Sequence, residues 1–256
     1  MKAAIVIPAR YASTRLPGKP LLSETGKPLI QHVYERAMEA NEAASVVVAT
    51  DDARIFDAVR NFGGKAVMTG VQETGSARVA EAAAAIDAQI IVNLQGDEPE
   101  IDPGALDRLI GLQRETGAFA STLACRFKDK VASGPGSPED AAAVKVIPGA
   151  AIDAAAFWAR YFTRNICPWP RDDRDAITAP SRYFLHLGVY AFSRRRLFEF
   201  AAQPVGALEA SERLEQLRIL EMGARIAVGV VDDGAPGIDT PDDYRAFVHR
   251  VKKGAA

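Results

Sequence analysis

Short apolar runs alternate with longer segments of helical periodicity through the first half of the chain, and this alternation restricts the possible folds more than any other feature. The expected strands are residues 3–7, 46–49, 65–68 and 90–94, and the expected helices are residues 28–40, 53–62 and 76–86 and one that begins near Pro103. The last of these strands is apolar at four of its five positions, which is typical of a parallel strand buried on both faces. The sequence therefore predicts an open, mostly parallel sheet covered by helices.

The second half of the chain is less regular. The expected elements are a loop at 131–140, strands at 144–147, 184–192 and 226–231, and helices at 157–162 and 208–221. In the last of these helices, Ala210, Leu214, Leu217 and Leu220 would form one apolar stripe. The change in periodicity near residue 120 could mark a subdomain, or one sheet could continue through it.

The composition is that of an enzyme-sized globular domain. The chain has 256 residues, of which 48% are hydrophobic, enough to bury a sizeable core. Its 31 basic residues nearly cancel 33 acidic ones, so no extended surface for nucleic acid or for an anionic membrane is expected. The two cysteines, Cys125 and Cys167, favour buried thiols in a reducing compartment. Because neither a signal peptide nor a membrane span is recognised, we expect a cytoplasmic protein without membrane insertion.

Cations gather in the loop that follows the first expected strand. The segment ARYASTRLPGKP contains Arg10, Arg15 and Lys19. In open α/β folds, ligands bind at the carboxyl edge of the sheet, where this loop lies. Arginine binds phosphate oxygens in pairs and lysine acts as a point charge, so the three cations could converge on a triphosphate. Neither a P-loop nor a GxGxxG motif occurs there. The alternative is three solvated surface cations.

Carboxylates lie at two other expected strand ends. The segment NLQGDEPEID places Asp97 and Glu98 directly after a buried strand, and GIDTPDD places Asp239 after the last expected strand. Because Mg²⁺ commonly takes one or two protein carboxylates with phosphate and water oxygens, Asp97 and Asp239 could share one magnesium ion. In the alternative, DTPDD is a helix start that Asp239 or Thr240 caps, with Pro241 in the first turn.

Six motifs occur in one order along the chain. They are IPARYASTRLPGKPL, VATDDARI, NLQGDEPEI, YFLHLGVYAF, LEQLRILE and GIDTPDD. Together they resemble the 3-deoxy-manno-octulosonate cytidylyltransferases, also called CMP-Kdo synthetases. The first and third are shared in looser form with other sugar nucleotidyltransferases, whereas HLGVYAF and LEQLR resemble the Kdo-type enzymes in particular.

This resemblance implies a nucleotide-diphospho-sugar transferase fold, which is a Rossmann-like, mostly parallel sheet flanked by helices. It implies a single nucleotidyltransferase domain over residues 1–256, with a smaller mixed α/β subdomain for substrate binding and dimerisation at about 120–205. The implied partners are CTP, an acidic 3-deoxy-2-ulosonate sugar and a second copy of the chain. The implied cofactor is Mg²⁺, and the implied product is CMP-Kdo for lipopolysaccharide synthesis.

The resemblance also implies roles for individual residues. The residues implied to contact the nucleotide are Pro8, Ala9, Arg10, Arg15, Lys19, Gly75, Ser76 and Arg78. Asp97 and Asp239 would hold the metal ion, and together with Arg10 and Lys19 they would form the catalytic group. The residues implied to surround the sugar are Gln95, Arg164, His186, Tyr190, Glu215 and Gln216.

Without the family resemblance, the residue types and their spacing give weaker evidence for a sugar-binding site. His186 and Tyr190 are four apart in an alternating strand, so they share a face that could line a sugar pocket or simply meet solvent. Arg164 could bind a substrate carboxylate or pack its alkyl stem on nearby aromatic rings. Glu215 and Gln216 could equally lie on a solvated helix face.

The segment MTGVQETGSAR departs from the family pattern. The family has an SGTDR-like run with a histidine upstream, whereas this chain has Gln72 and Glu73 in place of the histidine and Ala77 in place of the acid. Ala77 offers no side-chain hydrogen bond. A variant Kdo, another acidic sugar such as a sialate, and a non-catalytic nucleotide-binding protein are therefore alternatives to a Kdo-transferring enzyme.

Overall fold

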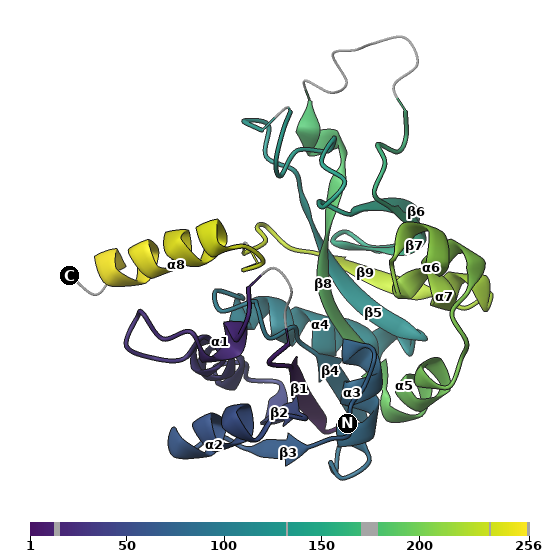
Figure 1. Ribbon diagram of the computed structural model, residues 1–256. Coiled ribbons are helices and arrows are strands. Elements are labelled where there is room, and N and C mark those ends of the chain that lie inside the picture. Colours follow the sequence, from purple (N-terminus) through teal and green to yellow (C-terminus); the bar gives the residue numbers. More distant parts are fainter. Residues whose placement is uncertain (13–15, 132, 170–178, 236, 255–256) are drawn as a thin grey trace. The chain divides into compact units, whose positions relative to one another are not determined.

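The computed structural model describes residues 1–12, 16–131, 133–169, 179–235 and 237–254 (Figure 1). The chain divides into a first unit, Met1–Gly111 with Ala235–Ala256, and a second unit, Leu112–Gly234. Residues 120–205, the expected subdomain, fall within the second unit, and their part in dimerisation stays a prediction. No helix in the described part of the chain is long and apolar enough to cross a membrane.

The first unit is built on parallel strands in the order β3-β2-β1-β4 (Figure 1). The strands are β1 (Ala3–Ala9), β2 (Ala43–Thr50), β3 (Ala66–Met68) and β4 (Ile90–Asn93). The helices are η1 (Lys19–Leu21, a 3-10 turn), α1 (Leu29–Met38), α2 (Ala53–Asn61), α3 (Gly75–Ala83), the start of α4 (Pro103–Thr116), and α8 (Pro241–Gly254). β1 pairs with β2 on one side and β4 on the other, so the expected parallel sheet is confirmed.

Local sequence explains where these elements lie. The residues of β1 and β4 are almost all buried because α1 and α3 pack against the sheet. The Asp52 side chain accepts a hydrogen bond from the Arg54 N–H and so caps α2, and the Thr74 hydroxyl accepts from the Ala77 N–H and caps α3. Gly63 follows α2 at a φ of 82°, the left-handed conformation that ends many helices.

The second unit contains a mixed sheet in the order β8-β5-β9-β7-β6, in which β6 also pairs with β8. The strands are β5 (Ala120–Arg126), β6 (Lys145–Asp153), β7 (Ala156–Thr163), β8 (Phe184–Ser193) and β9 (Ile226–Val230). The helices are η3 (Pro180–Arg182, a 3-10 turn), α5 (Arg194–Ala201), α6 (Ala207–Glu212) and α7 (Gln216–Glu221). β5 runs parallel to β9, whereas its pairing with β8 is antiparallel. β5 and α5 are not among the elements expected from the sequence.

The expected helix at 157–162 is wrong. These residues belong to β7, which pairs antiparallel with β6 and β9. The aromatic residues of FWARYF are spaced as in an amphipathic helix, but aromatic side chains favour strands, and a run this short has no decisive period. Phe157 and Phe162 are buried at the two ends of the strand.

The expected helix at 208–221 is also wrong, because the segment forms two short helices, α6 and α7. Arg213 follows α6 in the left-handed region, with a φ of 55°, and Ala210 is exposed, so the proposed apolar stripe does not exist. The Arg164 guanidinium donates to the carbonyl oxygens of the last α6 residue and of Arg213, at 2.7 and 3.3 Å. It thereby satisfies acceptors that the end of a helix leaves unpaired.

Candidate active site

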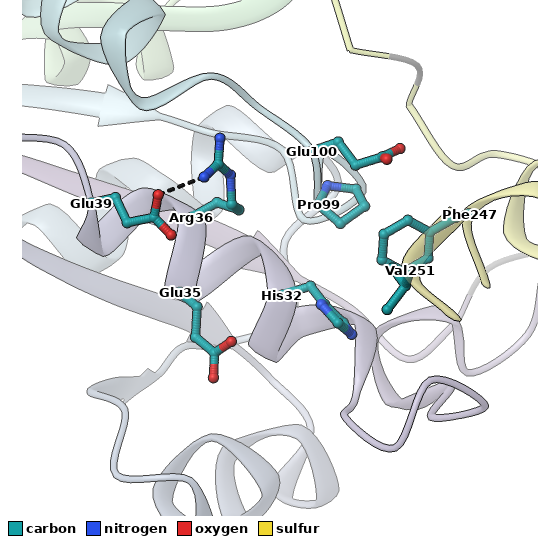
Figure 2. Close-up of a pocket in the computed structure, with 8 residues that line it drawn as sticks. All are labelled: His32, Glu35, Arg36, Glu39, Pro99, Glu100, Phe247 and Val251. Carbon is teal, nitrogen blue, oxygen red and sulfur yellow. Dashed lines mark hydrogen bonds and ion pairs between the residues drawn. The ribbon is translucent and has the colours of Figure 1, made fainter. Parts of the chain in front are cut away.

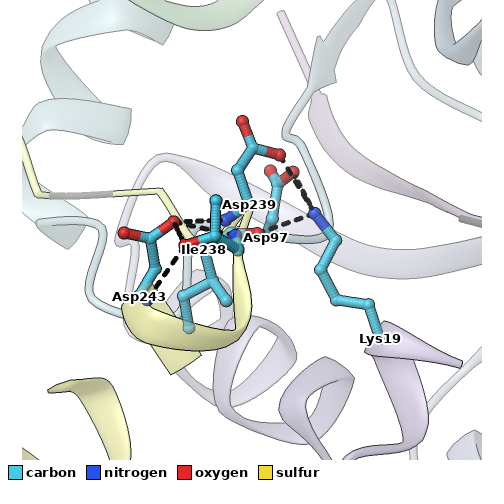
Figure 3. A network of polar contacts seen from close by, with 6 residues as sticks. Lys19, Asp97, Ile238, Asp239 and Asp243 are labelled. Carbon is cyan, nitrogen blue, oxygen red and sulfur yellow. Dashed lines mark hydrogen bonds and ion pairs between the residues drawn. The ribbon is translucent and has the colours of Figure 1, made fainter. Parts of the chain in front are cut away.

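Three residues from distant parts of the sequence meet at one point of the first unit (Figure 3). Lys19 begins η1, Asp97 lies in the segment after β4, and Asp239 precedes α8. The Lys19 Nζ lies 2.7 Å from Asp97 Oδ2 and 3.5 Å from Asp239 Oδ1. It also donates to the Ile238 carbonyl oxygen at 2.7 Å. The structure thus brings together one of the expected phosphate-binding cations and both of the expected metal carboxylates.

The turn before Lys19 depends on a glycine. Gly18 has a φ of 67°, and its N–H donates to the Tyr11 carbonyl oxygen at 3.1 Å. A Cβ at this position would lie 3.2 Å from the Tyr11 ring, closer than ordinary contact allows. Pro20 is buried in the next position and restricts the backbone of η1. These features fix the point from which Lys19 reaches the carboxylates.

The segment after Asp97 is joined to the segment that carries Asp239. The Ile238 N–H donates to the Asp97 carbonyl oxygen at 2.9 Å. α8 then begins with a reciprocal cap, in which the Asp243 N–H donates to the Thr240 hydroxyl and Asp243 Oδ2 accepts from the Thr240 N–H. Of the two alternatives for DTPDD, the helix start is present, and Thr240 rather than Asp239 caps it.

A fourth titratable group lies beside this cluster. Glu98 is half-buried, and burial is the main cause that raises its pKa to about 8, with further increases from the charges of Asp97 and Asp239 and an opposing effect of Lys19. The Glu98 carboxyl is therefore mostly neutral near pH 7. Its neutrality limits the negative charge that accumulates around Lys19.

The oxygen atoms around Lys19 Nζ have the chemistry of a magnesium site. Asp97 Oδ2, Asp239 Oδ1 and the Ile238 carbonyl oxygen are hard donors that converge on one cation. Within the described ranges there is no group of three or more His, Cys, Asp or Glu residues that could hold a metal ion by itself. A donor set with two carboxylates fits Mg²⁺ that completes its octahedron with phosphate and water oxygens.

The other residues of the opening loop lie along the end of β1 and beyond it. Ala9 is buried and Pro8 is half-buried, whereas Arg10 is exposed and has no hydrogen bond or ion pair among the described residues. Arg15 lies outside the residues that the structure describes. Arg10 is therefore available to a ligand, and the nucleotide contacts of all four residues stay predictions.

The first turn of α3 is linked to the end of β4. The Asn93 Nδ2 donates to Ser76 Oγ at 3.3 Å, and the Gln95 Nε2 donates to Asn93 Oδ1 at 3.3 Å. A Cβ on Gly75 would lie 3.5 Å from Pro8 and 3.6 Å from Gln95 Oε1, so the backbone of α3 passes close to both. The link therefore connects implied nucleotide and sugar residues. Asn93 is missed by the sequence analysis, although a polar residue that ends a continuous apolar run is a usable signal.

Arg78 contacts the protein rather than solvent. It is 3% exposed, and its Nη2 lies 2.9 Å from Asp51 Oδ2 while its Nη1 lies 2.6 Å from the Thr69 hydroxyl oxygen. These contacts join α3 to residues that follow β2 and β3. Arg78 therefore supports the backbone around the expected nucleotide site, and a direct contact with the base or ribose stays a prediction.

Glu81 holds the segment that departs from the family pattern. Its carboxylate accepts from the Gly70 N–H at 2.9 Å and from Gln72 Nε2 at 2.7 Å. The N–H of Gly70 and then the amide of Gln72 lower the pKa of Glu81 below its usual value. The two bonds tie the loop before α3 to the second turn of the helix, without an acid at Ala77.

In the second unit, His186 and Tyr190 share one face of β8, with ring centroids 5.5 Å apart. Both are half-buried rather than solvated. Thr122 Oγ1 lies 3.0 Å from His186 Nε2, and the Phe162 ring packs edge-on at 4.9 Å. Burial lowers the pKa of His186 to about 3, and burial together with the charge of Glu215 raises the pKa of Tyr190. Near neutral pH the pair is thus an uncharged imidazole and a phenol, groups that suit hydroxyl-rich ligands.

Gln216, which begins α7, has a buried amide nitrogen without a partner. The residue is 5% exposed, and its Nε2 has no hydrogen bond among the described residues. The solvated helix face that was the alternative for Gln216 is therefore wrong. An unpaired buried donor is costly in a folded protein, and a contact of this nitrogen with the sugar stays a prediction. Glu215, next to it, is half-buried.

α7 is fixed by a buried ion pair. Arg218 donates to both carboxylate oxygens of Glu209, each at 2.6 Å, and these residues are 7% and 6% exposed. Arg218 also donates to the carbonyl oxygens of Phe200 and Gln203, at 3.4 and 3.1 Å. The pair joins α6 to α7, and the two carbonyl contacts join α7 to Phe200 in α5 and to Gln203 beyond it.

The sequence model of the cytidylyltransferases matches residues 4–226. The chain belongs to the cytidylyltransferase family. It is 43% identical to the 3-deoxy-manno-octulosonate cytidylyltransferase of Rhodopirellula baltica, over 98% of this chain and 99% of the relative. It is 42% identical to the 8-amino-3,8-dideoxy-manno-octulosonate cytidylyltransferase of Shewanella amazonensis, with the same coverage. The resemblance inferred from the motifs is confirmed, and the chain is a nucleotidyltransferase.

Solved structures confirm the expected fold. A CMP:2-keto-3-deoxy-manno-octonic acid synthetase complexed with CTP superposes with a TM-score of 0.88 at 40% identity, over 99% of this chain and 100% of the other. An apo UDP-glucose pyrophosphorylase superposes with a TM-score of 0.67 at 16% identity, over 100% of both chains, and at that identity the likeness concerns the fold alone.

In this cytidylyltransferase, the Arg164 guanidinium contacts the backbone of the protein at several points. Besides its two bonds at the end of α6, it donates to the Ala141 carbonyl oxygen at 2.9 Å. Lys145, which sequence analysis missed, is fully buried, and its Nζ donates to the carbonyl oxygens of Asp140 and Arg164 at 2.9 and 2.5 Å. The two cations hold backbone segments together, and a sugar contact of Arg164 stays a prediction.

A cavity of about 350 Å³ lies elsewhere in the first unit (Figure 2). It is lined by His32, Glu35, Arg36, Glu39, Pro99, Glu100, Phe247 and Val251. Its charged groups are paired with one another or with neighbours: Arg36 with Glu39, Glu35 with Lys27, and Glu100 with Arg250. Since these pairs satisfy the charges, the cavity carries no functional assignment.

Proposed function

We propose that this cytidylyltransferase transfers CMP from CTP to the anomeric hydroxyl of 3-deoxy-manno-octulosonate (Kdo), in the cytoplasm, for lipopolysaccharide synthesis. The observation that carries the proposal is the cluster of Lys19, Asp97 and Asp239 in a chain that is 43% identical to a Kdo cytidylyltransferase over 98% of its length. A homodimer is proposed on the same resemblance.

The reaction is an in-line substitution at phosphorus. The anomeric oxygen of the sugar forms a bond to the α-phosphorus of CTP, the bond from that phosphorus to the bridging oxygen breaks, and pyrophosphate leaves. The hydroxyl proton passes to solvent. Such a transfer needs little covalent assistance, so the residues of the protein act mainly by positioning the substrates and by stabilising charge. No side-chain general base is assigned.

The residues of the first unit would neutralise the negative charge of the phosphates. Asp97 and Asp239 would hold Mg²⁺, and the bound ion would supply charge neutralisation at the phosphates and a more acidic attacking hydroxyl. Arg10, Arg15 and Lys19 would bind the phosphate oxygens and stabilise the charge that develops on pyrophosphate. Removal of one such donor typically costs about 3 kcal/mol of transition-state stabilisation.

The residues of the second unit would bind the sugar through uncharged groups. The neutral imidazole of His186 and the phenol of Tyr190 can exchange hydrogen bonds with hydroxyl groups. The unpaired Nε2 of Gln216 can donate to a sugar oxygen. Because a site that pairs its buried polar groups with substrate hydroxyls rejects analogues without them, these residues support selection of a polyhydroxylated acid.

A second candidate substrate is 8-amino-3,8-dideoxy-manno-octulosonate. The Shewanella amazonensis relative is named for this sugar and differs in identity from the Kdo-named relative by a single percentage point, 42% against 43%. Ala77, which replaces the acidic residue of the family pattern, lies in a segment implied to approach the nucleotide, so it does not distinguish the two sugars either. Overall identity thus does not separate the two sugars, and a direct comparison of substrates is needed.

The test is pyrophosphate release by the purified protein with Mg²⁺, each of the four nucleoside triphosphates, and Kdo, 8-amino-3,8-dideoxy-manno-octulosonate or sialic acid. Release that requires both CTP and Kdo is the expected result. Release with CTP and only another acidic sugar would assign that sugar as the substrate and would still support the proposed reaction. No release with any pair would favour a nucleotide-binding protein without catalysis.

A further inference from the structure

Asn93 is a buried amide between residues that are implied to contact different substrates. It ends the apolar strand β4 and is 1% exposed. Burying an amide is unfavourable unless hydrogen bonds compensate. Here both hydrogen-bond partners are residues implied to contact a substrate. Its Nδ2 donates to Ser76, implied to contact the nucleotide, and its Oδ1 accepts from Gln95, implied to contact the sugar, both at 3.3 Å.

The direction of each hydrogen bond determines whether Gln95 and Ser76 can donate to a ligand or accept from it. Because Asn93 Oδ1 accepts from Gln95 Nε2, the other end of the Gln95 amide, Oε1, is left to accept. Both ends border the first turn of α3, with Oε1 3.6 Å and Nε2 4.0 Å from where a Cβ of Gly75 would lie. Because Ser76 Oγ accepts from Asn93 Nδ2, the hydroxyl proton of Ser76 is left to donate elsewhere. Gln95 thus presents an acceptor and Ser76 a donor.

We propose that Asn93 is a positioning residue that orients Gln95 as a hydrogen-bond acceptor and Ser76 as a donor toward the substrates. The inference rests on the proposed function, which supplies the nucleotide and the sugar. It assigns a ligand chemistry to each position: the group that meets Gln95 is a hydroxyl or an ammonium, and the group that meets Ser76 is an acceptor oxygen or nitrogen of the nucleotide.

The test compares two buried amides. Asn93→Leu has nearly the same size and removes both bonds. The expected result is a rise of about tenfold in both the KM for Kdo and the Kd for CTP, with kcat within about threefold of wild type, because orientation of the binding groups is lost while the charged residues stay in place.

The matched control is Gln113→Leu in the second unit. Gln113 is 3% exposed, donates to the Ala118 carbonyl oxygen at 2.9 Å and accepts from the Ser121 hydroxyl at 2.7 Å. This variant should lower the Tm as Asn93→Leu does, but leave both constants at wild-type values. A shift in Tm without a shift in KM or Kd for Asn93→Leu would reduce Asn93 to a structural role and overturn the proposal.

Titration of CTP by calorimetry, without sugar, separates this inference from the proposed function. A wild-type protein that binds CTP but turns over no sugar would overturn the proposed function, and the CTP affinity of Asn93→Leu would still decide the role of Asn93. A wild-type protein without CTP affinity would overturn both. If Asn93→Leu does not fold, Asn93→Ser, which is too short to bridge both partners, should raise the same constants, and wild-type constants there would overturn the proposal.

Discussion

The ammonium group of Lys19 lies 2.7 Å from the carboxylate of Asp97, at a point where oxygens of Asp97, Asp239 and Ile238 converge. The Lys19 side chain is 15% exposed, so solvent screens this contact less than it screens a surface ion pair. The same carboxylates are proposed to hold Mg²⁺. Lys19 and a metal ion therefore compete for the same oxygens, whereas the phosphates of CTP would attract both.

Lys19→Met should separate the competition of Lys19 with a metal ion from its contact with the CTP phosphates. Without the ammonium, Asp97 and Asp239 lose a favourable partner, so Mn²⁺ used as a probe should bind about tenfold more tightly in the absence of nucleotide. CTP should bind about tenfold more weakly, because a phosphate contact is lost. Mn²⁺ binding is measured by electron paramagnetic resonance and CTP binding by calorimetry.

Lys27→Met is the control for Lys19→Met, since Lys27 pairs with Glu35 at 2.7 Å and both side chains are more than 40% exposed. It should change neither affinity. Unchanged or weaker Mn²⁺ binding by Lys19→Met would show that the ammonium does not occupy the cation position.

Asp97→Ala and Asp239→Ala should each lower kcat by at least about a hundredfold, because each would remove one of the proposed ligands of the metal ion. The fold should be retained, since neither carboxylate lies in the core. Pyrophosphate release at saturating CTP and Kdo gives kcat, and circular dichroism checks the fold. Asp102→Ala, at an exposed position before α4, is the matched control and should keep near-normal turnover. Near-normal turnover of both site variants would refute the metal assignment.

The parallel half of the fold could be predicted because its signals are local. Apolar runs such as residues 90–92 give buried strands, and Thr74 and Gly63 mark helix ends within a few residues. The placement of Lys19 and Asp97 at the same edge of the sheet also follows from local information, because the carboxyl ends of parallel strands lie at one edge.

The second half could not be predicted in the same way. β7 is a strand because β6 and β9 pair with it, and no short window of FWARYF contains that information. The carbonyl oxygens at the break between α6 and α7 accept from Arg164, which lies 49 residues before Arg213. Asn93 and Lys145 gain their roles from partners distant in sequence, so their identity alone gives little indication of function.

His186→Gln should reduce the acid sensitivity of the protein. In the unfolded chain the imidazole takes a proton near its ordinary pKa of 6.5, whereas in the folded protein it stays neutral down to about 3. Between these values the unfolded state binds more protons, so the free energy of unfolding falls as the pH is lowered through this range. From pH 7 to pH 5 the variant should lose less stability than wild type, by about 2 kcal/mol.

Urea unfolding at several pH values measures this difference between His186→Gln and wild type. In the wild-type protein, the NMR signal of the His186 ring should not titrate between pH 8 and pH 5. Equal losses of stability in the two proteins, or titration of the ring in that range, would contradict the neutral imidazole proposed to meet the sugar.

Glu209→Ala should destabilise the second unit strongly. The substitution leaves the guanidinium of Arg218 buried without its carboxylate, a situation that typically costs about 3–5 kcal/mol. Because Arg218 ties α7 in place, the KM for the sugar should also rise through displacement of Gln216. Urea unfolding and steady-state kinetics measure the two effects.

Two further variants test whether burial causes the effect of Glu209→Ala. Glu199→Ala breaks the pair with Arg196, whose side chains are 36% and 38% exposed, and should cost only about 0.5 kcal/mol. The double variant Glu209→Leu with Arg218→Met removes both buried charges, and it should recover most of the stability that Glu209→Ala loses, since no unpaired charge is left. It should not restore the sugar KM, because the bonds from Arg218 to the carbonyl oxygens of Phe200 and Gln203 are also lost. A double variant as unstable as Glu209→Ala would place the cause in packing rather than in the unpaired charge.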